Sequence, residues 1–290
     1  MQTKPHEFMV KYTPHTRWAE GSGALIAVAF FLGSISGGLY LMSLYFNSIW
    51  GMFIGWLMAL LVGMVDMAHL HKPLRFWRML LRPNTSWIAR GFIFIALFIG
   101  FAAIQLILSY WFPGAVENVF KVFSGIYAFG VVIYSGFVLS YVKAIRLWNS
   151  AMIPLIFVIS GLIGGTAILL MISLGDSSMQ ADTLQFVLRI MLVAYAIMVV
   201  MHLWISTYSS SAARNSAIWI LKGNIASIFW AAIVLVGIVI PLFIFFLSSS
   251  EATALLIIGA IFVIIGNLAL RYILLKGGLY SPLTSSYDAV

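Results

Sequence analysis

Cysteine is absent from this chain and charge is scarce. Charged side chains make up only 8% of the 290 residues, and none of the residues is cysteine. The protein itself therefore cannot form a disulfide, a zinc–thiolate site or a cysteine-ligated iron–sulfur cluster. A soluble domain carries about 25% charged residues, whereas this sequence is 63% hydrophobic with a mean hydropathy of +1.07. The composition excludes a soluble domain and indicates an integral membrane protein.

Long apolar runs take the place of the missing charge. Each run is close to the roughly 20 residues that a helix needs to cross a bilayer, and none shows the in-out alternation of a barrel strand. We therefore predict an all-α membrane protein with eight spans. The predicted spans are Gly23–Phe46, Gly51–Leu70, Ile88–Phe112, Val122–Val142, Met152–Leu174, Phe186–Tyr208, Asn224–Ser248 and Ala252–Leu275.

A weak internal repeat divides the eight spans into two halves. The glycine-rich sequence GSISGGLYL at 33–41 aligns with GLIGGTAIL at 161–169. The pattern is compatible with an ancestral duplication, and also with the close helix packing that Gly-xxx-Gly allows. We predict a polar N-terminal segment at 1–22, a four-helix bundle at 23–150 with an interfacial loop at 71–87, a second bundle at 151–276 and a tail at 277–290. The N-terminal segment is too long and polar for an ordinary signal peptide, so the first run is expected to remain a span.

Basic residues gather on one side of the predicted spans. The N-terminal segment, the second, fourth and sixth loops and the C-terminus hold 14 of the 16 Lys and Arg, with Arg90 and Arg271 counted as flanking residues. The positive-inside rule then predicts that both termini lie in the cytoplasm, and we expect the protein in the plasma membrane of a prokaryote. Basic residues that dock a partner would produce the same bias, so the side of the membrane stays open.

Two polar residue types mark the end of the second span. Asp66 is the only acid well inside a predicted span, and carboxylates at such depth usually face a polar cavity or a proton route. His69 follows at the membrane edge and could hydrogen-bond a quinone or carry a proton. The alternatives are an interfacial Asp66 that caps or pairs locally and a solvated histidine. A haem is not expected, because its axial ligands would lie deep in facing helices and only His202 among the five histidines lies well inside a span.

The loop after the second span has the pattern of a short interfacial helix over Pro73–Leu81. Trp77 lies on one predicted face and the arginines on another, and Pro83 would end the helix. The basic residues are Arg75, Arg78 and Arg82. They could anchor lipid headgroups or dock a protein partner. Asn84, Thr85 and Ser86 form a polar lead into the third span and a predicted helix cap.

Two tyrosines share one predicted face of the fourth span. Tyr127 and Tyr134 are seven residues apart, which corresponds to two helical turns. Tyr134 lies nearer to the basic loop that follows, so its hydroxyl could point into a cavity on the same side as Asp66. The alternative is a packed ring with a locally satisfied hydroxyl. Gln105 and Arg189 are further buried polar candidates whose partners the sequence does not reveal.

Four stretches together resemble a known family. The loop HLHKPLRFWRMLLRPNTSWIARG (69–91) and the fourth-span stretch IYSGFVLSYVKAIRLWNS (133–150) are similar to signatures of the NrfD/PsrC family of polysulfide reductase membrane subunits. The glycine-rich first span and RNSAIWILKGNIASIFW (214–230) resemble that family too. The resemblance implies a quinone-interacting subunit of a respiratory oxidoreductase that exchanges electrons between menaquinol and a partner.

The resemblance also implies partners and site residues. The expected partners are a ferredoxin-like iron–sulfur subunit, a molybdopterin catalytic subunit and membrane lipid, with no nucleic acid and with no haem or metal in this protein. Asp66, His69, Lys72 and Tyr134 match the quinone-site and proton-handling positions. The first span lacks the polar residue that some members direct at the quinone, and Glu20 is the nearest replacement. The rival functions are a secondary transporter and a passive membrane anchor.

Overall fold

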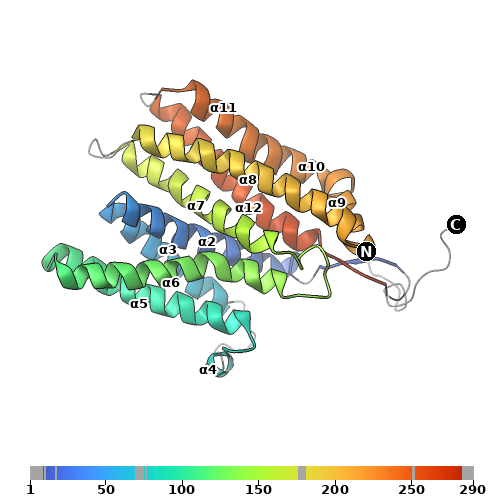
Figure 1. The fold of residues 1–290 in the computed structure, drawn as a ribbon, viewed down its shortest axis with the longest axis horizontal. Coiled ribbons are helices and arrows are strands. Elements are labelled where there is room, and N and C mark those ends of the chain that lie inside the picture. The colour runs from blue at the N-terminus through green and yellow to red at the C-terminus, as the bar shows by residue number, and fades with distance from the viewer. Residues whose placement is uncertain are drawn as a thin grey trace.

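The fold consists of long helices that run side by side (Figure 1). The computed structural model describes residues 9, 11–16, 18–68, 75, 77–81, 83–175, 181–249 and 252–282. Within these residues, eight helices are long and apolar enough to cross a membrane, which confirms the predicted all-α class and the number of spans. They are α2 (Ala24–Tyr45), α3 (Ile49–Ala68), α5 (Trp87–Trp111), α6 (Ala115–Ser140), α7 (Met152–Ser173), α8 (Ala181–Ser209), the seventh span (Ala226–Leu247) and α12 (Thr253–Lys276).

Two spans begin earlier than their apolar runs. Helix α6 starts at Ala115 rather than Val122, and α8 starts at Ala181 rather than Phe186. Each early turn carries one acid, Glu117 or Asp182. An acid near a helix N-terminus is favoured by the helix dipole and the free N–H groups there. Hydropathy alone therefore placed both boundaries too late.

The seventh span is interrupted by a π-helix. It consists of α10 (Ala226–Ile228), the π-helix η3 (Phe229–Val239) and α11 (Ile240–Leu247). At its end, the Ile240 N–H donates to the carbonyl of Leu235, five residues back. Pro241 follows in the first turn of α11, where its missing N–H is tolerated. Long π-helices are rare, and this one packs against α12.

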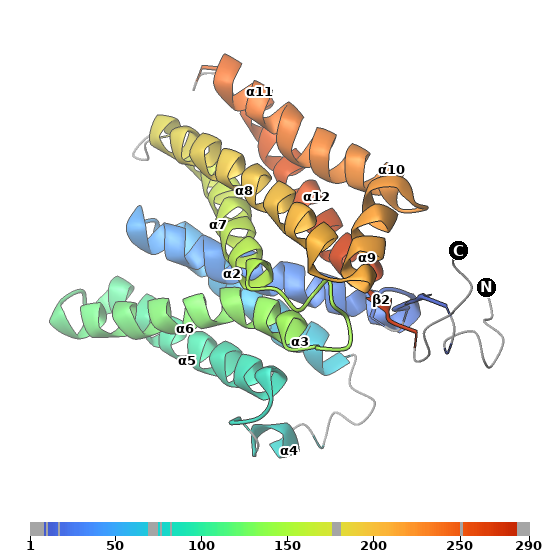
Figure 2. The ribbon, with the colours of Figure 1, turned by 45° about the vertical axis from the view of Figure 1, so that its right-hand side comes forward.

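Glycines bring α2 and α7 into backbone contact. A Cβ atom at Gly38 would lie 2.1 Å from the Gly161 carbonyl oxygen, and one at Gly165 would lie 2.1 Å from the Leu39 nitrogen. The two glycine-rich stretches of the internal repeat therefore pack directly on each other. Helices α3, α5 and α6 lie on one side of this contact, and α8 and α12 lie with α7 on the other (Figure 2).

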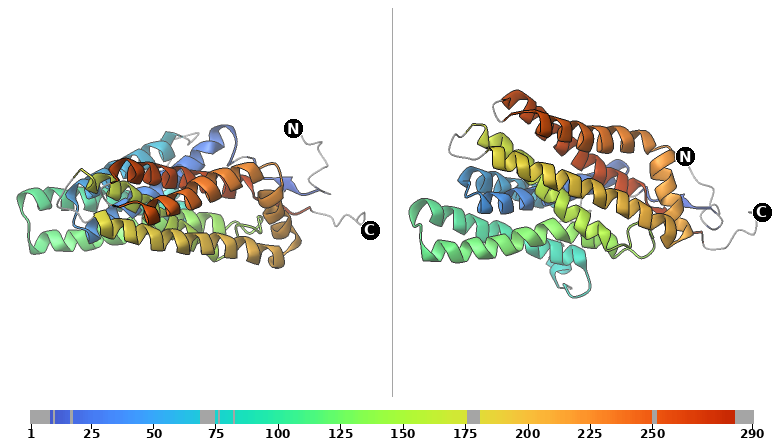
Figure 3. Two further views of the ribbon diagram at one scale, coloured as in Figure 1. Left: turned by 90° about the horizontal axis from the view of Figure 1, so that it is seen from above. Right: turned by 45° about the horizontal axis from the view of Figure 1, so that its top comes forward.

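Short elements collect at one end of the long helices. They are the helices α4 (Trp77–Leu80) and α9 (Ser211–Lys222), the turn η1 (Gly21–Gly23) and the strands β1 (Thr13–Pro14) and β2 (Leu279–Tyr280). The strands pair antiparallel, with Thr13 opposite Tyr280, so segments near the two ends of the chain lie together (Figure 3). His15 joins this pairing, because its Nδ1 lies 2.7 Å from the Tyr280 hydroxyl.

Candidate functional site

Tyr134 of α6 is only 4% exposed and is packed against α2 and α5. A Cβ atom at Gly91 of α5 would lie 2.3 Å from Tyr134 Cδ2, so the tyrosine ring occupies the space that a side chain would fill. The hydroxyl lies 3.9 Å from the position of a Cβ atom at Gly33 of α2. The ring of Phe30 meets the tyrosine edge-on, with 6.4 Å between centroids. The packing fixes the ring and directs the hydroxyl towards α2 and α3.

Asp66 completes this site from α3. It lies one turn after Val62, whose Cγ1 is 3.7 Å from the Cβ position at Gly33, and two residues before the helix ends at Ala68. The Asp66 carboxyl lies within electrostatic range of the Tyr134 hydroxyl. Across the part of the chain that the structure describes, neither group has a hydrogen-bond or ion-pair partner. An acid inside a membrane span is costly, so an unpaired one near a tyrosine hydroxyl marks a candidate site.

The other residues predicted to bind the quinone or carry protons lie away from Asp66 and Tyr134 or outside the described residues. His69 and Lys72 lie outside the described residues. Tyr127 stacks on Phe101 with 5.3 Å between ring centroids, about 10 Å along α6 from Tyr134 at 1.5 Å per residue. Glu20 is exposed, and its carboxylate lies 3.8 Å from the Lys276 ammonium group on α12. The structure therefore brings Asp66 and Tyr134 together, and it gives Tyr127 and Glu20 other neighbours.

Of the predicted docking residues, Trp77 and Arg78 lie on the short helix α4. Arg75, Trp77 and Arg78 are exposed, and the Arg78 guanidinium lies 5.5 Å from the Trp77 ring centroid. Arg82 lies outside the described residues, as do parts of the predicted helix over 73–81. The helical part that is described, α4, spans four residues. It presents a basic and aromatic surface beyond the ends of α3 and α5.

The start of α5 ties this loop to the site. The Ser86 side chain accepts a hydrogen bond from the Ala89 N–H, which confirms the predicted cap. Arg90 donates to the Pro83 carbonyl at 2.7 Å and lies over the Trp87 ring at 4.4 Å. Trp87 in turn stacks on Phe137 of α6, with 4.3 Å between centroids. Phe137 lies three residues after Tyr134 on α6. The stack of Trp87 on Phe137 therefore connects the loop to the helix that carries the candidate site.

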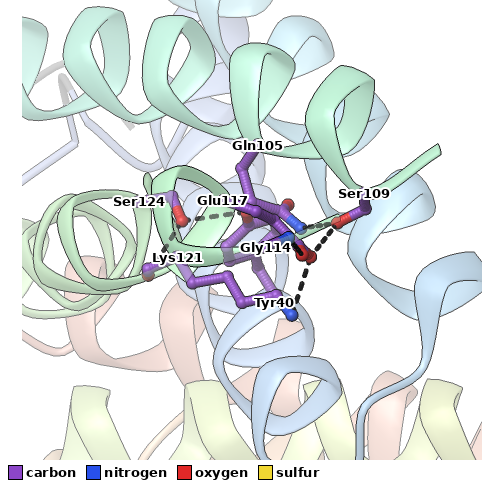
Figure 4. Close-up of polar contacts among 7 residues, drawn as sticks. All are labelled: Tyr40, Gln105, Ser109, Gly114, Glu117, Lys121 and Ser124. Carbon is purple, nitrogen blue, oxygen red and sulfur yellow. Dashed lines mark hydrogen bonds and ion pairs between the residues drawn. The ribbon is translucent and has the colours of Figure 1, made fainter. Parts of the chain in front are cut away.

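A second polar cluster lies at the other end of the same helices (Figure 4). The Tyr40 hydroxyl lies 2.7 Å from Gln105 Oε1 and 2.9 Å from Ser124 Oγ. The Gln105 amide also donates to Ser109 at 2.7 Å. Glu117 accepts from Ser109 and from the Gly114 N–H, and its carboxylate pairs with Lys121 at 2.7 Å. Because each of these groups has a partner inside the cluster, we interpret it as a structural tie between α2, α5 and α6.

Arg271 is one of the buried polar residues that the sequence did not single out. The charge count treated it as a residue flanking the basic face, which is wrong, because its side chain is fully buried. Its Nη1 donates to Asn267 Oδ1 at 2.7 Å and its Nη2 donates to Ser34 Oγ at 2.8 Å. The guanidinium also lies 4.5 Å from the Phe157 ring centroid. The available signal was the spacing of Asn267 and Arg271, which places them on one helix face.

The fold and the site define a multi-pass membrane protein with an acid–tyrosine pair between the helices of its first half. Residues 22–282 match the family described as "Polysulphide reductase, NrfD". The protein belongs to this family, which confirms the resemblance seen in its loop and span motifs. It is also 24% identical over 239 residues to the C subunit of polysulfide reductase from Wolinella succinogenes, a match that covers 72% of this sequence and 74% of that protein.

Proposed function

We propose that this protein is the quinone-interacting membrane subunit of a polysulfide-reductase-type complex. In this proposal it exchanges electrons between menaquinol and an iron–sulfur partner subunit, which passes them to a molybdopterin catalytic subunit. The observation that carries the proposal is the Asp66–Tyr134 pair. The pair combines a carboxyl and a hydroxyl without described partners, held by packed helices near one membrane face. Family membership supports the same assignment.

The chemistry of the pair fits a quinone or quinol headgroup. The two oxygens of such a headgroup need a hydrogen-bond donor in the oxidised form and a proton acceptor in the reduced form. Tyrosine can donate, and an ionised aspartate can accept. Tyr134 is buried against glycines contributed by α2 and α5 and close to Val62 of α3. Mostly apolar walls with a few placed polar groups are typical of small-molecule sites.

Each residue then has a defined task. Menaquinol, when bound, supplies two electrons and two protons. The Tyr134 hydroxyl orients the headgroup by a hydrogen bond, and the ring cannot swing away because it fills the space at Gly91. Asp66 accepts the two protons one after the other and, being two residues from the end of α3, releases each to the nearby aqueous side. His69 is proposed to assist this proton transfer at the membrane edge.

The partner docks on the same side in this proposal. Arg75, Trp77 and Arg78 lie exposed beyond the end of α3, and they form a surface that suits an acidic protein face. A cluster held there would be close to the end of α3 that carries Asp66. Short distance between the quinone site and the cluster is what electron exchange requires. The basic loop therefore serves the partner rather than lipid alone.

The test compares Asp66→Asn and Tyr134→Phe with Tyr127→Phe as a matched control on the same helix. We expect both site variants to oxidise a reduced menaquinol analogue about 100-fold more slowly, because general acid–base groups contribute roughly that much or more. Tyr127→Phe should retain the rate. Iron–sulfur content of the purified complex reports assembly and should not change. Normal rates in both site variants would refute the proposed site.

The same measurements separate the two rival functions. A passive anchor would co-purify with an iron–sulfur subunit whose clusters are never reduced by the quinol analogue. A secondary transporter would purify without iron–sulfur absorbance and would not respond to the quinol. Quinol-dependent cluster reduction that is lost in Asp66→Asn is the result expected from a quinone-interacting subunit.

A further inference from the structure

A groove between α6 and α7 lies outside the candidate quinone site. Its volume is about 470 Å³. Ile133 and Phe137 of α6 and Leu155 of α7 form its apolar walls, and Ser140, Asn149 and Ser150 form its polar end. Leu155 is 48% exposed on a membrane span, so the groove opens towards the lipid. It therefore has the apolar wall and polar end that suit an amphiphilic molecule.

The groove is built on rigid contacts. A Cβ atom at Gly136 would lie 2.6 Å from the Pro154 Cα atom, so α6 and α7 touch through their backbones at its floor. Phe137 is held from the other side by its stack on Trp87. At the polar end, the Asn149 amide donates to the Ser140 carbonyl at 2.9 Å and closes the connecting segment into a loop. A pre-formed site spends little free energy on ordering when it binds.

Positive charge lies on the segment that connects Ser140 to Asn149. The closed segment between Ser140 and Asn149 carries Lys143 and Arg146, and both are exposed. The sequence from 133 to 155 contains no aspartate or glutamate, so no acid of the groove or its loop offsets these charges. Cations beside the bilayer surface attract anionic headgroups, whereas an uncharged headgroup would gain nothing from them.

We propose that the α6–α7 groove binds an anionic phospholipid. Its phosphate lies beside Lys143 and Arg146, its glycerol region meets Ser140 and Asn149, and one acyl chain lies along Phe137 and Leu155. Helix α6 lies with α3 and α5 on one side of the α2–α7 contact, and α7 lies with α8 and α12 on the other. A lipid bound to both α6 and α7 therefore strengthens the contact between the two sides. This proposal is independent of the quinone chemistry at Asp66 and Tyr134.

The test uses the purified full-length protein in nanodiscs of phosphatidylcholine with or without phosphatidylglycerol. Native mass spectrometry counts retained lipid, and thermal unfolding reports the effect on stability. We expect the wild-type protein to retain phosphatidylglycerol preferentially and to unfold at a higher temperature with it. The double variant Lys143→Gln, Arg146→Gln should lose both effects, and so should Leu155→Trp, which fills the apolar wall.

A second double variant controls for non-specific charge. Arg214→Gln, Lys222→Gln removes two exposed cations from α9 and should keep the phosphatidylglycerol preference. Equal losses in the two double variants would overturn the proposal, because binding would then follow net charge alone. Displacement of the retained lipid by a menaquinone analogue would also overturn it, by assigning the groove to quinone. Quinol oxidation, measured separately, should not change in Leu155→Trp.

Discussion

The Arg271 guanidinium of α12 donates a 2.8 Å hydrogen bond to Ser34 Oγ of α2, across 237 positions of sequence. It is a charge-assisted contact between the last span and the first, inside the membrane region. Because the arginine is fully buried, its N–H groups cannot turn to water when a partner is lost. A hydrogen bond therefore joins α12 to α2 in addition to the packing of their side chains.

Removal of the Ser34 hydroxyl should destabilise the protein. In Ser34→Ala one guanidinium N–H loses its acceptor, at a cost of about 1–3 kcal/mol for an unsatisfied buried group. Ser36→Ala is the matched control, because that buried hydroxyl bonds only to the Gly33 carbonyl of its own helix. Thermal unfolding of the detergent-solubilised protein should show a lower midpoint for Ser34→Ala than for Ser36→Ala. Equal midpoints would show that the contact contributes no net stability.

A methyl group at Gly91 should displace Tyr134. In Gly91→Ala the new Cβ atom would stand 2.3 Å from the tyrosine ring, so the ring must shift. A misplacement of about 1 Å can cost roughly 100-fold in rate, and we expect a loss of that order in quinol oxidation. Gly100→Ala lies on the same helix with nothing within 4 Å of its Cβ position, and it should retain the rate. Similar activities in the two variants would argue against Tyr134 as a positioning residue.

The buried tyrosines Tyr40 and Tyr134 should respond in opposite ways when each loses its hydroxyl. Tyr40→Phe removes the group that meets Gln105 and Ser124, and the unsatisfied amide should cost about 1–3 kcal/mol of stability. Its assembled complex should oxidise quinol at the normal rate. Tyr134→Phe removes a hydroxyl without a described partner, so it should change the unfolding midpoint little and the rate strongly. Thermal unfolding and quinol oxidation are measured for both variants. If both variants lost the same property, Tyr40 could not be assigned to a structural cluster and Tyr134 to the quinone site.

The contact between α2 and α7 should be intolerant of any side chain. In Gly38→Ala the Cβ atom would meet the Gly161 carbonyl oxygen at 2.1 Å, and overpacking of this kind typically costs about 1–3 kcal/mol. Gly63→Ala in α3 has nothing within 4 Å of its Cβ position and serves as the control. A lower unfolding midpoint in Gly38→Ala alone is the expected result. If both variants unfold alike, the helices can separate without cost.

Much of the fold followed from the sequence because a bilayer demands a fixed length of apolar helix. The eight spans, the Ser86 cap and the paired glycine stretches are local patterns, and each has a local physical cause. Asp66 also stood out in the sequence as the only acid well inside a predicted span, and Tyr134 stood out because it lies near the end of the fourth span on the same side. The early starts of α6 and α8 could not be predicted from the sequence in this way, because hydropathy does not register an acid that suits a helix N-terminus.

Only the tertiary structure decided which polar groups have partners. The sequence counted Arg271 with the basic face, yet its position against Ser34 and Asn267 depends on how α12 is rotated and which helix lies beside it. The same is true of Gln105, whose partners come from α2 and from its own helix. Composition and periodicity determine that a helix crosses the membrane. Contacts between helices determine which of its polar side chains are satisfied, and so which remain available for chemistry.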